Sequence, residues 1–133
     1  MKVFLDTNVL ISAFATRGLC EDVMRAVLIE HELVVGEVVL EELQRVLETK
    51  FAVPLEIVQG LVDLLSQQRV VPRPDRPADI DIRDASDRWI LASAIAGRAD
   101  VLVTGDRDLL ELESAGGLQI LSPRGFWTLL TGK

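Results

Sequence analysis

The sequence has little of what disulfide scaffolds and histidine-based metal sites require. Among its 133 residues there is one cysteine, Cys20, and one histidine, His31. A single cysteine forms no internal disulfide, and the scarcity of both residues excludes zinc ribbons and multi-histidine metal sites. One histidine also leaves little room for a Ser-His-Asp triad. Any chemistry therefore has to come from other side chains.

Long apolar runs and an excess of positive charge are also missing. No apolar run approaches the length of a membrane span, and Asp6 interrupts the one stretch that resembles the core of a signal peptide. We therefore expect a cytoplasmic protein with no membrane partner. Lys and Arg total 14 against 21 Asp and Glu, which gives a net charge of −7. This balance argues against a protein that coats nucleic acid through its overall field, but it leaves room for a local site.

Short apolar segments alternate with helical patterns along the whole chain. The patterns predict strands at residues 2–5, 33–35, 69–71, 101–103 and 118–121, and helices at 19–30, 37–51, 54–68, 86–97, 108–113 and from 123 onward. Such alternation is typical of a parallel sheet covered on both faces. We expect one α/β domain over residues 1–133, with three α/β/α layers and a mostly parallel sheet of about four or five short strands. The proline-rich segment 72–85 is predicted to be a loop.

Two aspartates follow predicted strands at the sheet edge where α/β proteins bind their ligands. Asp6 follows the strand at 2–5, and Asp106 follows the strand at 101–103 after a two-residue turn. Ligands of open α/β sheets lie beyond the carboxyl ends of the strands, so both carboxylates are candidates for one site. The alternative is that each aspartate only caps the helix that follows it.

Two further acids lie on the predicted helices. Glu42 lies at the border of the apolar arc of helix 37–51, whereas its neighbour Glu41 points into solvent. Asp87 projects to the buried side of helix 86–97, and Asp84 fits the helix cap. An ordinary boundary residue at Glu42 and a capping pair of Asp84 with Asp87 are the alternatives.

Four carboxylates from distant segments are thus expected to converge. Two like charges at about 4 Å repel by on the order of 4 kcal/mol at an effective dielectric constant of about 20. No lysine or arginine is obviously placed to neutralise all four, and a divalent cation would do so. Oxygen ligands without histidine or cysteine favour Mg²⁺ or Mn²⁺, as one or two ions. Such a site suits phosphoryl chemistry.

Short motifs between residues 2 and 121 carry a combined pattern. They are Asp6-Thr7-Asn8-Val9-Leu10, Glu42-Leu43 within a helix, Asp87 with Ile90-Leu91-Ala92, and Thr104-Gly105-Asp106-Arg107-Asp108-Leu109. Together they resemble the PIN-domain nucleases, and most closely the small VapC-like toxins of toxin–antitoxin pairs. No single motif is specific, but four acids in this order and spacing make a strong combined signal.

The resemblance implies an endonuclease for single-stranded RNA that uses Mg²⁺ or Mn²⁺. It also implies a homodimer and a small antitoxin protein that blocks the site. Asn8 and Thr104 match polar positions that support the metal or its water, and Asp108 matches a less regular fifth acid. The acidic quartet of the family is matched by Asp6, Glu42, Asp87 and Asp106.

Several nearby residues keep two interpretations. Arg107 could contact a substrate phosphate or form an ordinary salt bridge. Trp89 lies on the outer side of its helix, where packing in the core or an interface is favoured over stacking on a base. The arginines around the loop could form an RNA track or be solvated loop charges: Arg73, Arg76, Arg83 and Arg88.

Two other functions compete with the nuclease. A catalytically silent PIN-like module would bind RNA or protein, although the presence of all four acids gives no sign of lost activity. A haloacid-dehalogenase-like phosphatase also has an aspartate after its first strand. That mechanism needs a second aspartate where this chain has Asn8, and a lysine near a strand end, where none is found.

Overall fold

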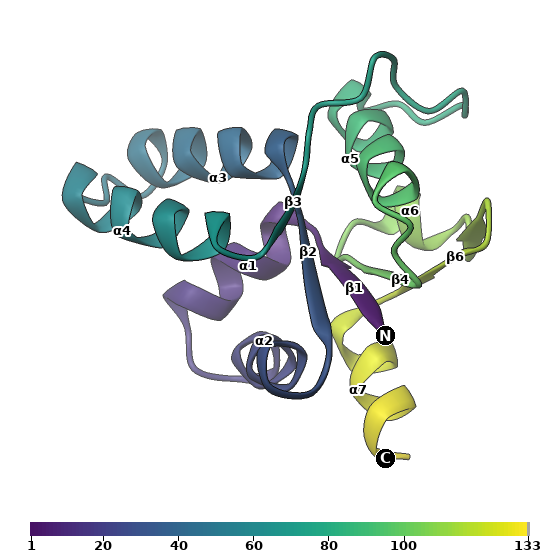
Figure 1. Cartoon of the computed structure of the whole chain (residues 1–133), viewed down its shortest axis with the longest axis horizontal. Helices are drawn as coiled ribbons and strands as arrows, with labels where there is room; N and C mark the ends of the chain where they lie inside the picture. Colours follow the sequence, from purple (N-terminus) through teal and green to yellow (C-terminus); the bar gives the residue numbers. More distant parts are fainter. Residues whose placement is uncertain (133) are drawn as a thin grey trace.

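The computed structural model describes residues 1–132, in which strands and helices alternate (Figure 1). The strands are β1 (Lys2–Leu5), β2 (Glu32–Gly36), β3 (Arg69–Val71), β4 (Val101–Val103), β5 (Ser114–Ala115) and β6 (Leu118–Leu121). The helices are α1 (Thr7–Ala15), α2 (Leu19–Glu30), α3 (Glu37–Thr49), α4 (Leu55–Ser66), α5 (Ala85–Ala96), α6 (Arg107–Leu110) and α7 (Pro123–Thr131).

The described strands form one sheet in the order β3-β2-β1-β4-β6-β5. Every neighbouring pair is parallel except β5 with β6. The chain adds β2 and β3 on one side of β1 and then crosses to add β4 and β6 on the other. The direction of winding therefore reverses between β1 and β4, and ligands of open α/β sheets bind at such a switch point.

Helices cover both faces of this sheet. Figure 1 shows α1 to α4 grouped on one side of β1, β2 and β3, with α5 on the other side. This arrangement follows from right-handed crossovers, because the connection from β3 back to β4 runs in the opposite direction to the first two. The predicted α/β class with a mostly parallel central sheet is confirmed.

The central strands are buried on both faces, which explains their uninterrupted apolar sequences. Residues 3–5 and 101–103 are at most 1% exposed. Where β2 ends, a Cβ on Gly36 would lie 2.9 Å from Cζ of Phe4 in β1. Only glycine allows this approach, and it lets α3 begin directly at the sheet edge with Gly36 as its N-cap.

Some elements differ from the prediction. Residues 7–15 form α1, where the sequence showed only an apolar segment, and α6 ends at Leu110 instead of continuing to 113. The sixth strand, β5, was not predicted. It forms a hairpin with β6 through Gly116 and Gly117, whose φ angles of 55° and 84° suit a tight turn.

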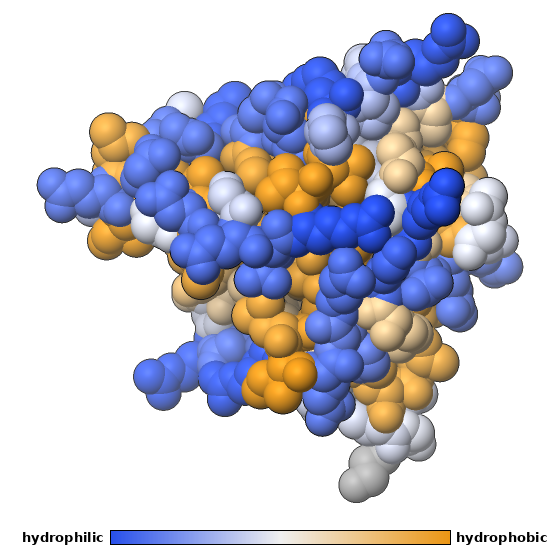
Figure 2. Space-filling model, viewed as in Figure 1, coloured by the Kyte–Doolittle hydropathy of each residue, from blue (hydrophilic) through white to orange (hydrophobic). Residues whose placement is uncertain are grey.

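Apolar side chains also remain at the surface. Figure 2 shows orange atoms between hydrophilic ones over α2 and over the left end of α4. Leu28 and Ile29 of α2 are 42% and 73% exposed, and Leu55 and Ile57 of α4 are 60% and 56% exposed. Within residues 1–132, no helix has the length and apolar character needed to cross a bilayer.

Candidate functional site

An open cavity of about 440 Å³ lies at the switch point of the sheet. It receives Asp6 from the end of β1, Asp106 from the turn after β4, Glu42 from α3 and Asp87 from α5. The four acids that the sequence singled out therefore line one space. We call it the acidic cavity, and its polar lining is completed by Thr7, Asn8, Arg45, Lys50, Asp84 and Ser86.

Asp6 is buried, and both of its carboxylate oxygens accept hydrogen bonds. Oδ1 accepts from the backbone N–H of Thr7 at 2.7 Å, so that Asp6 caps α1. Oδ2 accepts from Oγ1 of Thr104 at 2.7 Å and from Nδ2 of Asn8 at 3.3 Å. Burial raises the pKa of Asp6 to about 6, while the bonds from Thr104 and Thr7 lower it. The capping interpretation is thus confirmed for this residue, and Asp6 also lines the acidic cavity.

The same two polar residues join the loops after β1 and β4. Oγ1 of Thr104 accepts from the backbone N–H of Asp106 at 3.0 Å, and Oδ1 of Asn8 accepts from that of Gly105 at 3.1 Å. Thr104 is fully buried, so its hydroxyl is not in contact with solvent and depends on hydrogen bonds within the protein. Asn8 and Thr104 therefore position both strand-end carboxylates.

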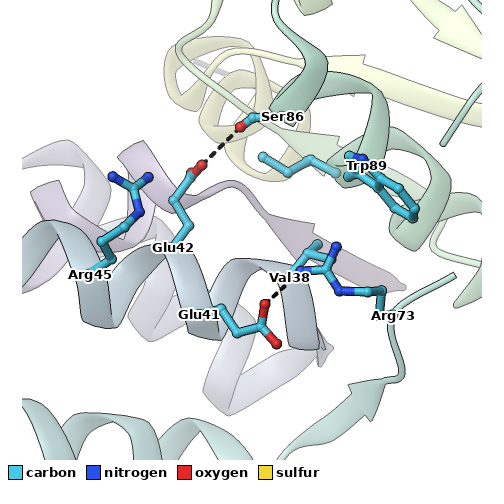
Figure 3. Close-up of a pocket in the computed structure, with 8 residues that line it drawn as sticks. Val38, Glu41, Glu42, Arg45, Arg73, Ser86 and Trp89 are labelled. Atoms are coloured by element: carbon cyan, nitrogen blue, oxygen red, sulfur yellow. Dashed lines mark hydrogen bonds and ion pairs between the residues drawn. The ribbon is translucent and has the colours of Figure 1, made fainter.

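On α3, the two adjacent glutamates face different surroundings (Figure 3). Oε2 of Glu42 accepts a hydrogen bond from Oγ of Ser86 at 2.9 Å. Glu41 is exposed and is bound by Nη2 of Arg73 at 2.6 Å, so the prediction that it faces solvent is confirmed. The contact of Ser86 was missed by the sequence analysis, whose only signal was its place in the first turn of α5, between Asp84 and Asp87.

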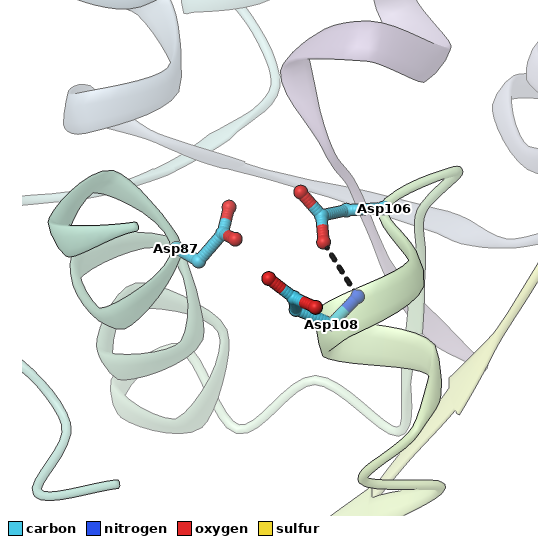
Figure 4. Close-up of side chains that lie close together, drawn as sticks. All are labelled: Asp87, Asp106 and Asp108. Atoms are coloured by element: carbon cyan, nitrogen blue, oxygen red, sulfur yellow. Dashed lines mark hydrogen bonds between the residues drawn. The ribbon is translucent and has the colours of Figure 1, made fainter. Parts of the chain in front are cut away.

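Three aspartates approach one another most closely (Figure 4). Asp87, Asp106 and Asp108 each offer one carboxylate oxygen, and these atoms lie within 4.8 Å of one another. Asp106 also caps α6, because its Oδ1 accepts from the N–H groups of Asp108 at 2.8 Å and Leu109 at 3.4 Å. Asp108, expected only to support the quartet, thus joins Asp87 and Asp106 more tightly than Asp6 or Glu42 does.

Asp87 is the least compensated of these acids. It is 5% exposed, and within residues 1–132 its buried Oδ2 has no hydrogen-bond partner. Burial, together with the negative charges of Asp106 and Asp84, raises the pKa of Asp87 to about 7. Asp84 itself is the N-cap of α5, as predicted, and accepts from the N–H of Ser86 at 2.9 Å.

A divalent cation fits this set of donors. Within residues 1–132, none of Asp6, Glu42, Asp87 and Asp106 forms an ion pair. Asp108 lies 3.9 Å from Arg83, whose side chain is 92% exposed, and such pairs contribute little. An unpartnered buried oxygen beside two other carboxylates, with no sulfur or imidazole ligand, suits Mg²⁺ or Mn²⁺.

The arginines do not gather around the acids. Arg107 is exposed, does not line the acidic cavity and forms no ion pair within the described chain, so neither interpretation of this residue gains support from the structure. Arg83 approaches Asp108, and Arg73 pairs with Glu41. Arg45 of α3 does line the acidic cavity.

A second cavity of about 330 Å³ adjoins the first. The two share Glu42, Arg45, Ser86 and Ile90. We call the second one the Trp89 cavity, and the residues found only in it are Val38, Glu41, Arg73 and Trp89.

Comparison with known proteins gives one family and several similar structures. The family model of the PIN domain matches residues 2–108. A chain in the crystal structure of VapBC2 from Rickettsia felis, bound to a DNA fragment from their promoter, superposes with a TM-score of 0.65 at 18% identity, over 92% of this chain and 98% of that chain. For VapBC-1 from nontypeable Haemophilus influenzae the TM-score is 0.64 at 20% identity, over 93% and 99%.

DNA-bound VapBC from Salmonella typhimurium superposes with a TM-score of 0.61 at 22% identity, over 92% of this chain and 98% of that chain. No curated protein matches the sequence significantly. The match to the PIN-domain model covers every acid of the cavity, and it leaves the haloacid-dehalogenase alternative without support.

Proposed function

The chain belongs to the PIN-domain family, and from this premise we propose that it is a metal-dependent endonuclease that hydrolyses phosphodiester bonds in single-stranded RNA. The observation that carries the proposal is the acidic cavity. Four carboxylates from four separate segments line it, and none of them has a basic partner within residues 1–132. A fold has little reason to concentrate unpaired charge unless a cation completes the site.

The proposed ligands of Mg²⁺ or Mn²⁺, as one or two ions, are four acids of this cavity and the neighbouring Asp108. Asp87, Asp106 and Asp108 bring one oxygen each within a common 4.8 Å, and Asp6 and Glu42 complete the wall. When bound, such an ion supplies Lewis acidity toward a phosphate oxygen and a nucleophilic water at neutral pH.

The protein's own residues hold the reacting groups in place. Asp6 is fixed by the hydroxyl of Thr104 and the amide of Asn8, so it presents its carboxylate in one orientation. Ser86 fixes one oxygen of Glu42, and the other accepts no hydrogen bond within residues 1–132. That free oxygen is suited to orient the attacking water and to accept its proton.

We also propose that the chain is the toxin of a type II toxin–antitoxin pair, acting in the cytoplasm as a homodimer. The similar structures are of VapBC assemblies. The surface supports a protein partner, because an apolar cavity of about 240 Å³ lies between α1, α2 and α4. Leu28 and Leu64 line it and are 42% and 47% exposed, and exposed apolar patches mark interaction sites.

The test of the activity uses labelled single-stranded RNA and DNA of the same sequence, each with Mn²⁺, Mg²⁺ or EDTA. We expect metal-dependent cleavage of the RNA and at least about 100-fold slower cleavage by Asp106→Asn and Glu42→Gln. Glu48→Gln, an exposed change on the same helix, should cut like the parent. Equal cleavage by all variants would reveal a contaminating nuclease, and RNA binding without cleavage would favour the catalytically silent module.

The test of the partner is coexpression with the protein encoded by the neighbouring reading frame. Leu28→Asp and Leu64→Asp should each abolish copurification, because a charge would then lie inside the apolar contact. Glu30→Gln, an exposed change on α2, should leave it intact. If copurification survives both leucine changes, the interface with the partner does not include this apolar cavity.

A further inference from the structure

The Trp89 cavity has walls of distinct chemistry (Figure 3). The half-buried indole of Trp89 and the buried side chains of Val38 and Ile90 supply its apolar surface. Its polar surface comes from arginine and glutamate side chains of α3 and of the loop after β3. At about 330 Å³, it falls at the lower end of the range of about 300–1,000 Å³ that small-molecule sites occupy.

The indole ring already has a flat cation stacked on it. The guanidinium carbon of Arg73 lies 5.2 Å from the ring centroid, and Nη2 of Arg73 binds Oε2 of Glu41 at 2.6 Å. Both partners of this ion pair are about half exposed, at 45% and 56%, so the pair contributes little and can open. The planar face of Trp89 can therefore exchange Arg73 for another flat group without a large loss.

The position of this cavity limits what that group can be. Glu42 and Ser86, joined at 2.9 Å, form the boundary between the two cavities. A ligand that fills the Trp89 cavity thus lies beside the carboxylates that would hold the metal. In a nuclease, the neighbour of the cleaved phosphate is a nucleotide of the same strand.

A protein interface is the competing use of Trp89. The centre of such interfaces is depleted of acidic side chains, whereas this cavity carries Glu41 and Glu42 beside one aromatic ring. Arginines beside an exposed aromatic face are the usual equipment for single-stranded nucleic acid, in which bases stack and phosphates meet cations.

We propose that the Trp89 cavity binds one nucleobase of single-stranded RNA, next to the phosphate that is cleaved. Trp89 stacks on the base, and Arg73 and Arg45 contact the flanking phosphates after Arg73 leaves Glu41. This assignment rests on the proposed nuclease function, because that function sets the chemical class of the ligand. It changes the interpretation of Trp89 from the packing that its sequence position favoured.

Fluorescence can follow this one residue directly. The chain has two tryptophans, so Trp127→Phe leaves Trp89 as the sole tryptophan, and adding Asp106→Asn prevents cleavage during the titration. We expect quenching of Trp89 by a short single-stranded RNA, and at least about 10-fold weaker binding of an abasic strand of equal length. Equal quenching by both strands would mean that the cavity contacts only the backbone, and it would overturn the proposal.

Kinetics with the active enzyme separates this proposal from the nuclease proposal. Trp89→Ala should raise KM for RNA about 10-fold and change kcat less than about 3-fold, and Trp89→Phe should restore most of the loss because it keeps a stacking face. Trp127→Phe is the matched control and should change neither constant.

The remaining outcomes separate the proposed nucleobase site from the proposed nuclease function. Normal cleavage by Trp89→Ala with unchanged KM, and no response of Trp89 to RNA, would overturn the nucleobase site and leave the nuclease standing. Failure of the parent to cut or bind any RNA would overturn both. A Trp89 signal that responds to a coexpressed protein partner and not to RNA would assign the cavity to an interface. If Trp89→Ala does not fold, Trp89→Leu, which keeps apolar volume but has no stacking face, and Arg73→Ala give the KM comparison.

Discussion

Asp6 and Asp87 lie in the same cavity and are almost equally buried, at 2% and 5% exposure, but their surroundings differ. The carboxylate of Asp6 accepts three hydrogen bonds, from Thr7, Asn8 and Thr104. In the part of the chain that the structure describes, Oδ2 of Asp87 accepts none. The protein thus supplies hydrogen-bond donors to the carboxylate of Asp6, whereas Oδ2 of Asp87 is left to a ligand from outside the protein.

The difference follows from where each residue lies in the fold. Asp6 stands at the junction of a strand and a helix, where free backbone N–H groups and the side chains of a neighbouring strand end are available. Asp87 lies within the first turn of α5 and faces other acids across the cavity. A strand end can organise a carboxylate before any ligand arrives, whereas an inward-facing helix position concentrates negative charge that a cation relieves.

The largest effect should come from neutralising these two acids. Asp6→Asn and Asp87→Asn should each lower RNA cleavage by about 1,000-fold or more, because both remove a proposed metal ligand. Their effects on the metal-free protein should differ. Asp87→Asn should raise the free energy of unfolding by about 1–2 kcal/mol by removing a buried like charge. Asp6→Asn should raise it less or lower it, because the amide N–H that replaces an acceptor disrupts the hydrogen bonds to Asp6 and opposes the relief of the buried charge.

Urea denaturation in EDTA at pH 8 measures this contrast. Asp84→Asn is the matched control, because it neutralises an exposed acid at the start of the same helix. It should change stability by less than about 1 kcal/mol, the size of a helix-cap effect. Equal changes in Asp6→Asn and Asp87→Asn would mean that the two carboxylates do not differ in the way described.

The pH dependence of stability should show both groups. In the folded protein the pKa is about 6 for Asp6 and about 7 for Asp87, both above their ordinary 3.8. Between pH 3.8 and about pH 7, these two carboxyl groups bind more protons in the folded state than in the unfolded state. The free energy of unfolding in EDTA should therefore fall as pH rises from about 4 to 7 and then level off.

Asp87→Asn should remove the part of this decline near pH 7 and keep the part near pH 6. Added Mg²⁺ or Mn²⁺ should restore stability at pH 8 more than at pH 5, because ligands bind the ion in their ionised form. Thermal or urea unfolding at four pH values, with and without the ion, measures both effects. A metal-free stability that rises between pH 5 and 8 would contradict the assignment of these two groups.

The sequence could predict the helices and strands, which have recognisable apolar patterns, and the site residues that directly follow a strand. Short apolar segments located five of the six strands of the described chain. The helical period turned Asp87 inward and Glu41 outward, as the structure has them. Asp6 and Asp106 could be paired because the carboxyl ends of parallel strands meet at one edge.

Features that depend on a loop path or on one short turn could not be predicted. The position of Arg73 over Trp89 depends on how residues 72–84 leave β3, and no periodic pattern specifies that path. The closeness of Asp108 to Asp87 depends on the rotation of α6, a helix of four residues. The β5–β6 hairpin did have a signal in Gly116-Gly117, a pair that suits a tight turn.

Thr104→Val tests the support of Asp6 with a smaller change. It removes the hydroxyl that donates to Asp6 and accepts from the N–H of Asp106, while it nearly keeps the side-chain volume. We expect about 10-fold slower cleavage and a loss of about 1–3 kcal/mol of stability, because two buried groups lose a partner. Thr49→Val, which alters an exposed threonine on α3, is the control and should stay within about 0.5 kcal/mol of the parent.

The smallest effect is expected at Arg107, which adjoins Asp106 in sequence but does not line the acidic cavity. Because Arg107 is exposed and unpaired within residues 1–132, Arg107→Ala should change kcat/KM by less than about 2-fold.

Arg45 lines both cavities, and Arg45→Ala should raise KM about 5-fold through a lost phosphate contact. Steady-state kinetics at two salt concentrations compares them, because a phosphate contact weakens with salt. If kcat/KM falls 10-fold in Arg107→Ala and not in Arg45→Ala, the RNA binds closer to α6 than to the wall formed by α3 and α5.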